Sequence, residues 1–254
     1  MKKPLVSIIL PYFKKKKFIK KTISSIINQK YKKLELILVY DDEDKSDLSY
    51  IKKILSKLKN KKIIDNKINY GVSKSRNIGI NFAKGEYVAF IDADDIWDKN
   101  KIKEQIKEFK NNKKLDLIYT SYYVIDENDK ILGHRKVSQN ITYSKLLREC
   151  EIGTSTVLMK TKILKKYRFP LLNTQEDFGL WLKLLRLNFN FFSISKNFTK
   201  WRKDKNSLSS NNIQKIKDAY WLFYHYENMN FIFSIFCVLV LSFSKIKNNL
   251  TLKN

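Results

Sequence analysis

The chain has 254 residues, of which 43% are apolar and 13% aromatic, and its formal net charge is +26. This composition excludes a long disordered chain and supplies enough apolar side chains for one large domain or two small ones. The two cysteines, Cys150 and Cys237, lie far apart without metal-ligand spacing, so we expect a reducing compartment and no disulfide framework.

The excess of basic residues has two interpretations. Most of them are lysines spread over the predicted helices, which is typical of a composition bias with solvated helix faces. Clusters of arginine interleaved with aromatic side chains do not occur, so we expect no nucleic-acid partner. An anionic membrane surface is the partner that the charge still favours. The first apolar run is short and interrupted by Pro11, which does not fit a signal peptide, so we expect a cytoplasmic protein.

The first half of the sequence alternates between strand-like and helix-like segments. Apolar runs predict strands at 4–10, 34–39, 61–66 and 87–91, and helical periodicity predicts helices at 18–29, 47–58, 71–84 and 98–112. Asp98 is suited to cap the start of the last of these helices. Four β–α units of this length predict an α/β fold with a doubly wound, mostly parallel, Rossmann-like sheet, whose ligands collect at the carboxyl ends of the strands.

The second half has a more mixed pattern. Residues 116–126 and 131–137 are separated by "ENDK" and resemble a hairpin, 155–160 resembles a further strand, and 176–187 is helical. Internal repeats and a linker rich in proline, glycine or serine do not occur in the sequence. We therefore expect one catalytic domain at 1–210 and a C-terminal helical appendage at 211–254.

The appendage contains an apolar stretch, "FIFSIFCVLVLSF" (231–243), followed by Lys245 and Lys247. As a helix this stretch is about 20 Å long, which is short of a hydrocarbon core of roughly 30 Å. A helix packed on the protein body and a full membrane span are both open. We favour a segment that lies in the membrane interface, with lysines beside it for anionic lipid.

Acidic residues follow two of the predicted strands and begin one of the predicted helices. They stand in "VYDDED" (39–44), in "DADD" (92–95) and in "QEDF" (175–178). Carboxylates this close together resist ionisation unless a cation lies among them. An isolated D-x-D is also common in helix caps and turns, but after a buried strand it lets Asp92 and Asp94 share a Mg²⁺ or Mn²⁺ ion with substrate phosphates.

These residues resemble the family 2 nucleotide-sugar glycosyltransferases, an inverting family with the A-type fold, in its bacterial surface-polysaccharide subgroup. The resemblance covers 5–110 closely and 150–210 more loosely. It is carried by "NYGVSKSRNIGINFAKGEYVAFIDADDIW" (69–97), "TQEDFGLWLKLL" and "WRKDKNSLSS". It implies a hexosyltransferase-like enzyme that needs Mn²⁺ or Mg²⁺. It also implies sugar transfer from a nucleotide-diphosphate donor to a hydroxyl of a membrane-proximal glycan or lipid-linked acceptor, as in lipopolysaccharide synthesis.

The resemblance also implies roles for individual residues. For the donor, Pro11 and Phe13 line the nucleotide pocket, Asp41 accepts a hydrogen bond from the base, Arg76 holds the nucleotide, and Arg202 with Ser207 closes over the diphosphate. For the metal, Asp94 is a ligand, and Asp92 binds the ribose or a metal-bound water. For catalysis, Asp177 is the base and Glu176 orients the acceptor or the base.

Two other classes of protein remain open at this point. A sugar nucleotidyltransferase would also use a parallel sheet and Mg²⁺, but "PYFKKKK" lacks the glycine-rich loop expected after its first strand. A basic membrane-surface or nucleic-acid-binding protein with a non-catalytic nucleotide site is the second alternative. The presence of both the acidic triplet and Asp177 argues against it. We expect the protein at the inner face of the cytoplasmic membrane, as a peripheral enzyme.

Overall fold

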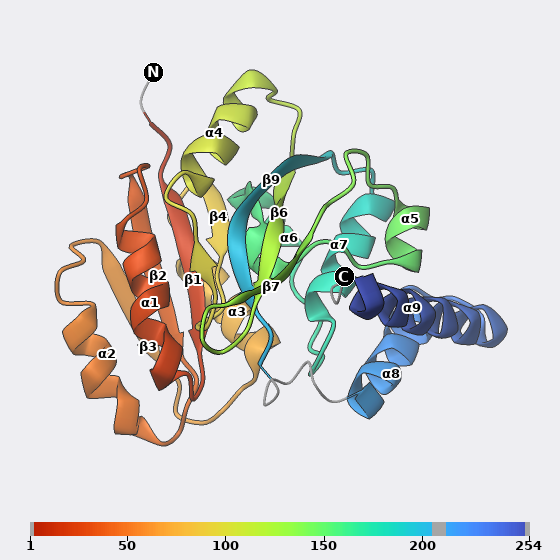
Figure 1. Cartoon of the computed structure of the whole chain (residues 1–254), viewed down its shortest axis with the longest axis horizontal. Coiled ribbons are helices and arrows are strands. Elements are labelled where there is room, and N and C mark those ends of the chain that lie inside the picture. The colour runs from red at the N-terminus through yellow and green to blue at the C-terminus, as the bar shows by residue number, and fades with distance from the viewer. Residues whose placement is uncertain (1–2, 205–211, 252–254) are drawn as a thin grey trace.

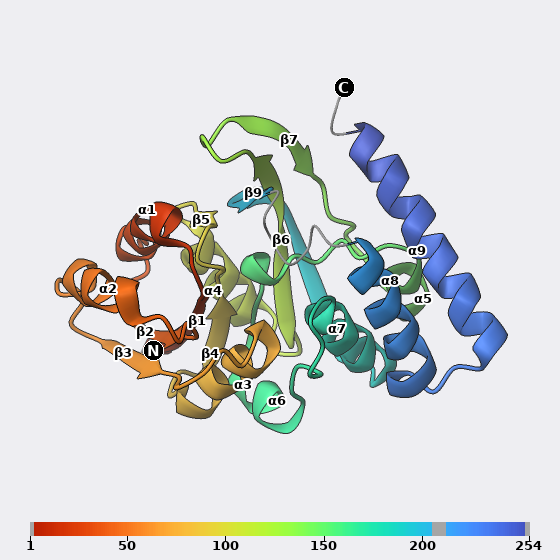
Figure 2. The ribbon, with the colours of Figure 1, turned by 90° about the horizontal axis from the view of Figure 1, so that it is seen from below.

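The computed structural model describes residues 3–204 and 212–251 (Figure 1). The strands of this part form one mixed sheet in the order β3-β2-β1-β4-β8-β6-β9-β5, and β7 pairs with β6 outside this path. Helices cover both faces of the sheet (Figures 1 and 2). The architecture is the predicted α/β class with a C-terminal helical appendage.

The N-terminal half is the doubly wound part. Its strands are β1 (Val6–Tyr12), β2 (Leu34–Tyr40), β3 (Lys61–Asp65) and β4 (Tyr87–Phe90), all parallel, and β5 (Ile96–Trp97). Its helices are α1 (Lys16–Ile27), α2 (Leu48–Ile54), α3 (Val72–Phe82) and α4 (Lys101–Asn111), with the 3₁₀ turn η1 (Lys45–Asp47) before α2. Each strand and helix predicted for this half is present, with bounds shifted by a few residues.

The apolar runs of this half are continuous because the sheet is buried on both faces. Consecutive residues of β1, Ile8 and Ile9, belong to two different core clusters, one on each face. Ile19 of α1 packs in the first cluster, with Ile8, and Ile80 of α3 packs in the second, with Ile9. A strand covered by helices on both sides needs apolar residues at every position.

The C-terminal half mixes strand directions. Its strands are β6 (Leu117–Ile125), β7 (Ile131–Arg135), β8 (Leu158–Lys160) and β9 (Phe191–Arg202). Its helices are α5 (Tyr143–Arg148), the 3₁₀ turn η2 (Thr154–Thr156), α6 (Thr161–Lys166) and α7 (Glu176–Arg186). The predicted hairpin is confirmed as the antiparallel pair β6–β7, and β8 is antiparallel to both β4 and β6. β9 runs parallel to β6 and antiparallel to β5.

Two predictions of local structure are wrong in detail. Asp98 does not cap α4, whose N-cap is Asn100. The Asp98 carboxylate instead accepts hydrogen bonds from the Asn100 backbone at 2.8 Å and side chain at 3.0 Å, which fixes the turn before the helix. The strand predicted at 155–160 is confined to β8, because Thr154–Thr156 form the 3₁₀ turn η2.

The C-terminal appendage consists of α8 (Asn212–Trp221), a π-helical turn (Leu222–Tyr226) and α9 (Phe231–Thr251). Figure 2 shows α9 beside α8 and α5 at the outer edge of the molecule. Its Cys237 is buried with Leu222 and Phe223 in the core cluster that also contains residues of α7. One face of α9 is therefore packed on the protein body, which is one of the alternatives that the sequence left open.

The opposite face of α9 is apolar and exposed. Its exposed large side chains are Phe231, Ile232, Phe233, Ile235, Phe236, Leu239 and Phe243. Among the described residues, every helix is too short or too polar to cross a membrane. The side chains of Lys245 and Lys247, which were expected beside this stretch, lie outside what the structure describes.

Candidate active site

The carboxyl ends of β2, β1 and β4 lie side by side and bring the predicted acidic residues together. Asp41 directly follows β2 and is buried. Its Oδ1 accepts hydrogen bonds from the Asn66 side chain at 2.7 Å and from the Tyr70 backbone at 2.9 Å. These contacts fix the Asp41 carboxylate at the sheet edge.

Two residues predicted to line the nucleotide pocket lie at the same edge. Pro11, in β1, is level with Val39 of β2, and Phe13 directly follows β1. Pro11 is half-buried, whereas the ring of Phe13 is 40% exposed. An exposed aromatic ring beside Asp41 is suited to stacking on a nucleotide base.

Arg76 joins the acidic loop after β4 to the acidic start of α7. Its Nη2 donates to Asp92 Oδ1 at 2.6 Å, and its Nη1 donates to Glu176 Oε1. The Arg76 side chain is only 3% exposed, and its guanidinium lies 5.5 Å from the centre of the Phe169 ring. Burial opposes the charge, but the two carboxylates raise the pKa of Arg76, so it stays protonated.

Asp94, in the same loop after β4, pairs with a second cation. Lys15 Nζ lies 2.9 Å from Asp94 Oδ2 and 2.6 Å from Asp204 Oδ2. Burial raises the pKa of Asp94, and the neighbouring Lys15 opposes this rise. Burial, together with Asp94 and Asp92, raises the pKa of Asp95 well above its ordinary value. Without a bound metal, the cations that lie among these carboxylates are therefore the side chains of Lys15 and Arg76.

Glu176 and Asp177 form the first turn of α7, where the helix dipole favours carboxylates. Burial raises the pKa of Glu176 to about 7 and also raises the pKa of Asp177, while Arg76 opposes both shifts. Asp177 Oδ2 accepts a hydrogen bond of 2.5 Å from the Thr154 hydroxyl, and its Oδ1 accepts one of 2.7 Å from the Phe178 backbone. Asp177 is thus a half-buried carboxylate in a fixed orientation, as a general base requires.

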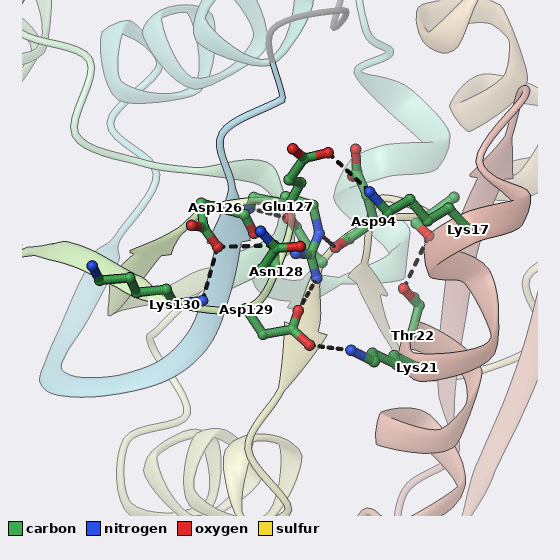
Figure 3. A network of polar contacts seen from close by, with 12 residues as sticks. Lys17, Lys21, Thr22, Asp94, Asp126, Glu127, Asn128, Asp129 and Lys130 are labelled. Carbon is green, nitrogen blue, oxygen red and sulfur yellow. Dashed lines mark hydrogen bonds and ion pairs between the residues drawn. The ribbon is translucent and has the colours of Figure 1, made fainter.

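The guanidinium of Arg202, at the end of β9, is already bonded to other parts of the protein. It donates to the Asp94 carbonyl at 2.9 Å, to the Asp126 carbonyl at 2.5 Å and to the Asp129 carboxylate at 2.6 Å. Figure 3 shows these three acidic residues. Arg202 therefore joins the tip of the β6–β7 hairpin to the acidic loop. Ser207, its expected companion, lies outside the described residues.

Several residues of this site were not identified from the sequence. Lys15 and Asn66 carried no motif, although the run "KKKK" (14–17) was a visible signal. Thr154 and Ser155 stand at the start of the strand predicted at 155–160, and no motif marks them as site residues. The structure joins Thr154 to Asp177, and the Ser155 hydroxyl accepts from the Asp92 backbone at 3.0 Å.

The donor set suits a divalent ion that is shared with a substrate. In the described part of the chain, groups of three or more histidine, cysteine or acidic side chains placed to hold a metal are absent. Mg²⁺ and similar ions are commonly held by one or two carboxylates plus phosphate and water. Asp92 and Asp94 supply such carboxylates, and the buried Oδ2 of the adjacent Asp95 lacks a hydrogen-bond partner. The residues fit a site that is completed by a donor diphosphate.

The α/β fold and the acid-lined sheet edge suit the binding of a diphosphate with a divalent ion, and comparison with known proteins gives the family. The sequence model of Glycosyl transferase family 2 matches residues 7–168, so the chain belongs to this family. The chain is 36% identical over 216 residues to UDP-Glc:alpha-D-GlcNAc-diphosphoundecaprenol beta-1,3-glucosyltransferase WfgD of Escherichia coli, a match that covers 84% of this chain and 83% of WfgD. Family membership decides between the classes left open by the sequence: the protein is a glycosyltransferase.

Solved structures share the fold at low sequence identity. TarS 1–349 of S. aureus, in complex with UDP-GlcNAc, matches with a TM-score of 0.72 and 20% identity, over 86% of this chain and 65% of that chain. The mannosyltransferase PcManGT of Pyrobaculum calidifontis, in complex with GDP-Man and Mn²⁺, matches with a TM-score of 0.69 and 14% identity, over 90% of this chain and 66% of that chain. These similarities concern the fold.

Proposed function

We propose that this glycosyltransferase moves a sugar, with inversion, from a nucleotide-diphosphate donor to a hydroxyl of a lipid-linked or membrane-proximal glycan. The observation that carries the proposal is the buried Arg76, which ties Asp92 to Glu176 and so holds the donor edge of the sheet beside the candidate base. The name of the E. coli relative describes UDP-Glc as donor and a diphosphoundecaprenol-linked sugar as acceptor, which supports the same classes of substrate here.

In this proposal the nucleotide binds at the carboxyl ends of β1 and β2. The base contacts Asp41 and lies against Phe13 and Pro11, and Arg76 stays charged beside the donor. Asp92 and Asp94 hold Mn²⁺ or Mg²⁺, which when bound stabilises the negative charge that develops on the diphosphate. Until the donor arrives, the Arg76 guanidinium pairs with Asp92 and the Lys15 ammonium pairs with Asp94.

Asp177 removes the proton from the acceptor hydroxyl in this proposal. Its raised pKa makes the carboxylate a stronger base, and the hydrogen bond from Thr154 fixes its orientation. A positioned base of this kind contributes around 10²–10⁴-fold to the rate. Glu176 keeps Arg76, and through it Asp92, in place. Direct contact between Arg202 and the diphosphate requires its guanidinium to leave Asp129.

The test of this function is a transfer assay combined with a binding assay. Purified protein is incubated with a panel of UDP- and GDP-sugars, Mn²⁺ and a lipid-diphosphate-linked sugar acceptor. We expect product with one donor, and Asp177→Asn should abolish transfer while the stabilisation of the protein by UDP or GDP with Mn²⁺ is unchanged. Near-wild-type transfer by Asp177→Asn would remove that residue from its role. A wild-type protein that binds no nucleotide would overturn the function.

We also propose that the exposed face of α9 lies on the inner surface of the cytoplasmic membrane. This face carries large apolar side chains on a strongly basic protein, a combination that binds anionic bilayers. A lipid-linked acceptor would then reach the site without leaving the bilayer.

Co-sedimentation with phosphatidylglycerol vesicles tests this surface. We expect binding by the wild type and a clear loss in the double variant Ile232→Ser/Phe236→Ser. Ile131→Ser, which alters an apolar residue of β7 that is 50% exposed, should bind like the wild type. Equal binding by all three proteins, or binding to uncharged phosphatidylcholine alone, would contradict the proposal.

A further inference from the structure

The start of α1 carries a run of lysines that the helix dipole disfavours. Cations are destabilised near a helix N-terminus, yet Lys15, Lys16 and Lys17 occupy the N-cap and the first two helical positions. The surrounding loops supply carboxylates for them. Lys16 lies 2.9 Å from Asp47, and Lys17 lies 2.8 Å from Glu127 of the hairpin tip (Figure 3).

Lys15 differs from its neighbours in burial and in its partner. Its side chain is 22% exposed, whereas those of Lys16 and Lys17 are about 60% exposed. Its ammonium contacts Asp94 at 2.9 Å, on a carboxylate oxygen that a divalent cation would also use. The second carboxylate at 2.6 Å, from Asp204, gives the ammonium a further anchor. The Lys15 ammonium thus lies at the Asp94 carboxylate, where a divalent cation would also bind.

The position of Lys15 also directs it toward the donor. It follows β1 by three residues, and β1 lies between β2 and β4, whose loops carry Asp41 and the acidic triplet. A lysine ammonium is a compact charge on a flexible stem of four carbons, so it reaches a phosphate by rotation of its side chain alone. A cation on Asp94 and an ammonium on the same oxygen repel each other, and one must leave.

We propose that Lys15 is the resident counter-ion of Asp94 and a ligand of the donor diphosphate. In the donor-free enzyme its ammonium neutralises Asp94 and opposes binding of a divalent cation on its own. When the cation and the nucleotide diphosphate bind together, Asp94 would hold the cation and the Lys15 ammonium would pair with phosphate. Cation and donor therefore bind cooperatively. This inference rests on the proposed function.

Direct measurement of Mn²⁺ binding tests the inference. The metal-free protein is titrated with Mn²⁺ by calorimetry, alone and with saturating UDP or GDP. We expect Lys15→Gln and Lys15→Ala to bind Mn²⁺ alone on the order of tenfold more tightly than the wild type, because a nearby ammonium repels a divalent ion by several times the thermal energy. The strengthening of Mn²⁺ binding by the nucleotide should shrink by a similar factor.

Two control variants separate charge from structure. Lys15→Arg keeps the positive charge and should bind Mn²⁺ as weakly as the wild type. Lys17→Gln removes a lysine of the same helical turn whose partner is not in the acidic loop, and it should leave Mn²⁺ binding unchanged. Unchanged Mn²⁺ affinity in both Lys15→Gln and Lys15→Ala overturns the inference and leaves the proposed function standing. A wild type that binds neither Mn²⁺ nor either nucleotide overturns both.

Discussion

Replacing Arg76 by methionine should destabilise the protein in a strongly pH-dependent way. The guanidinium is 3% exposed and the Glu176 side chain 8% exposed, so this is a buried ion pair from which one partner is removed. Asp92 is 34% exposed, and water screens most of its lost interaction. Removing one partner of a buried pair costs about 3–5 kcal/mol. At pH 8 we expect a loss at the lower end of this range, because the unpaired Glu176 can bind a proton and become neutral.

The pH dependence follows from the pKa of Glu176. Burial already raises this pKa to about 7 in the wild type, and loss of Arg76 raises it further. A carboxyl group whose pKa is higher in the folded state stabilises the fold when it is protonated. This stabilisation is complete below the pKa of the unfolded state, near 4.3, and it is lost as the pH rises through the pKa of the folded state. At pH 5 Glu176 is protonated in both proteins, so the difference in unfolding free energy is small. Above pH 7 Glu176 loses its proton in the wild type but stays protonated in the folded variant, whose stability therefore continues to fall with pH. The difference in unfolding free energy between the two proteins is then largest.

Urea denaturation at pH 5, 6, 7 and 8 measures this difference. The matched control is Arg135→Met, which breaks a partly exposed pair with Glu149 at 3.1 Å and should cost about 1 kcal/mol or less at each pH. At pH 8 the midpoint of thermal unfolding of Arg76→Met should fall by roughly 6–12 °C. An equal loss of stability at pH 5 and pH 8 would refute the assignment of the cost to an unpaired Glu176.

Two further outcomes are expected from single substitutions. Thr154→Val removes a hydrogen bond that lowers the pKa of Asp177. The acidic limb of the pH profile of kcat should therefore move to higher pH. A lower kcat with an unshifted acidic limb would mean that Thr154 does not act through Asp177. Lys101 is fully buried, and burial lowers its pKa well below the ordinary value, so it costs stability at neutral pH and the cost disappears toward pH 10. The difference in unfolding free energy between Lys101→Met and wild type should therefore fall as the pH rises from 7 to 10, as chemical denaturation would measure; a constant difference would contradict this.

The parts of the fold that follow from local pattern were predictable. The buried parallel strands have continuous apolar runs, and the acids at their ends stand out against a basic chain. β9 was missed, because its sequence "FFSISKNFTKWR" has neither a continuous apolar run nor a strict alternation. Its pairing with β6 also shifts register near Ser121, so its exposed and buried positions do not follow a period of two. β5 has two residues and gives no periodic signal.

The members of the candidate site were predictable only in part. Acids at strand ends were visible in the sequence, since strand order alone places them at one edge. The partners of these acids were not. Lys15 meets Asp94 across 79 positions, and β8, α6 and a loop separate Thr154 from Asp177. Such pairs depend on how elements far apart in the sequence pack in three dimensions, which no local pattern records.

The charge balance of the site links the metal to Lys15. In the donor-free protein Arg76 pairs with Asp92 and Lys15 pairs with Asp94, so both cations already have a carboxylate partner when a diphosphate arrives. A donor that arrives alone would have to draw Lys15 away from Asp94, whose side chain is 13% exposed, and leave this carboxylate without its partner, which is costly. In the proposed mechanism Asp94 would instead hold the divalent cation, and Lys15 would be free to pair with the diphosphate. On this proposal the acids of this basic chain favour a donor that arrives with its metal over a free nucleotide.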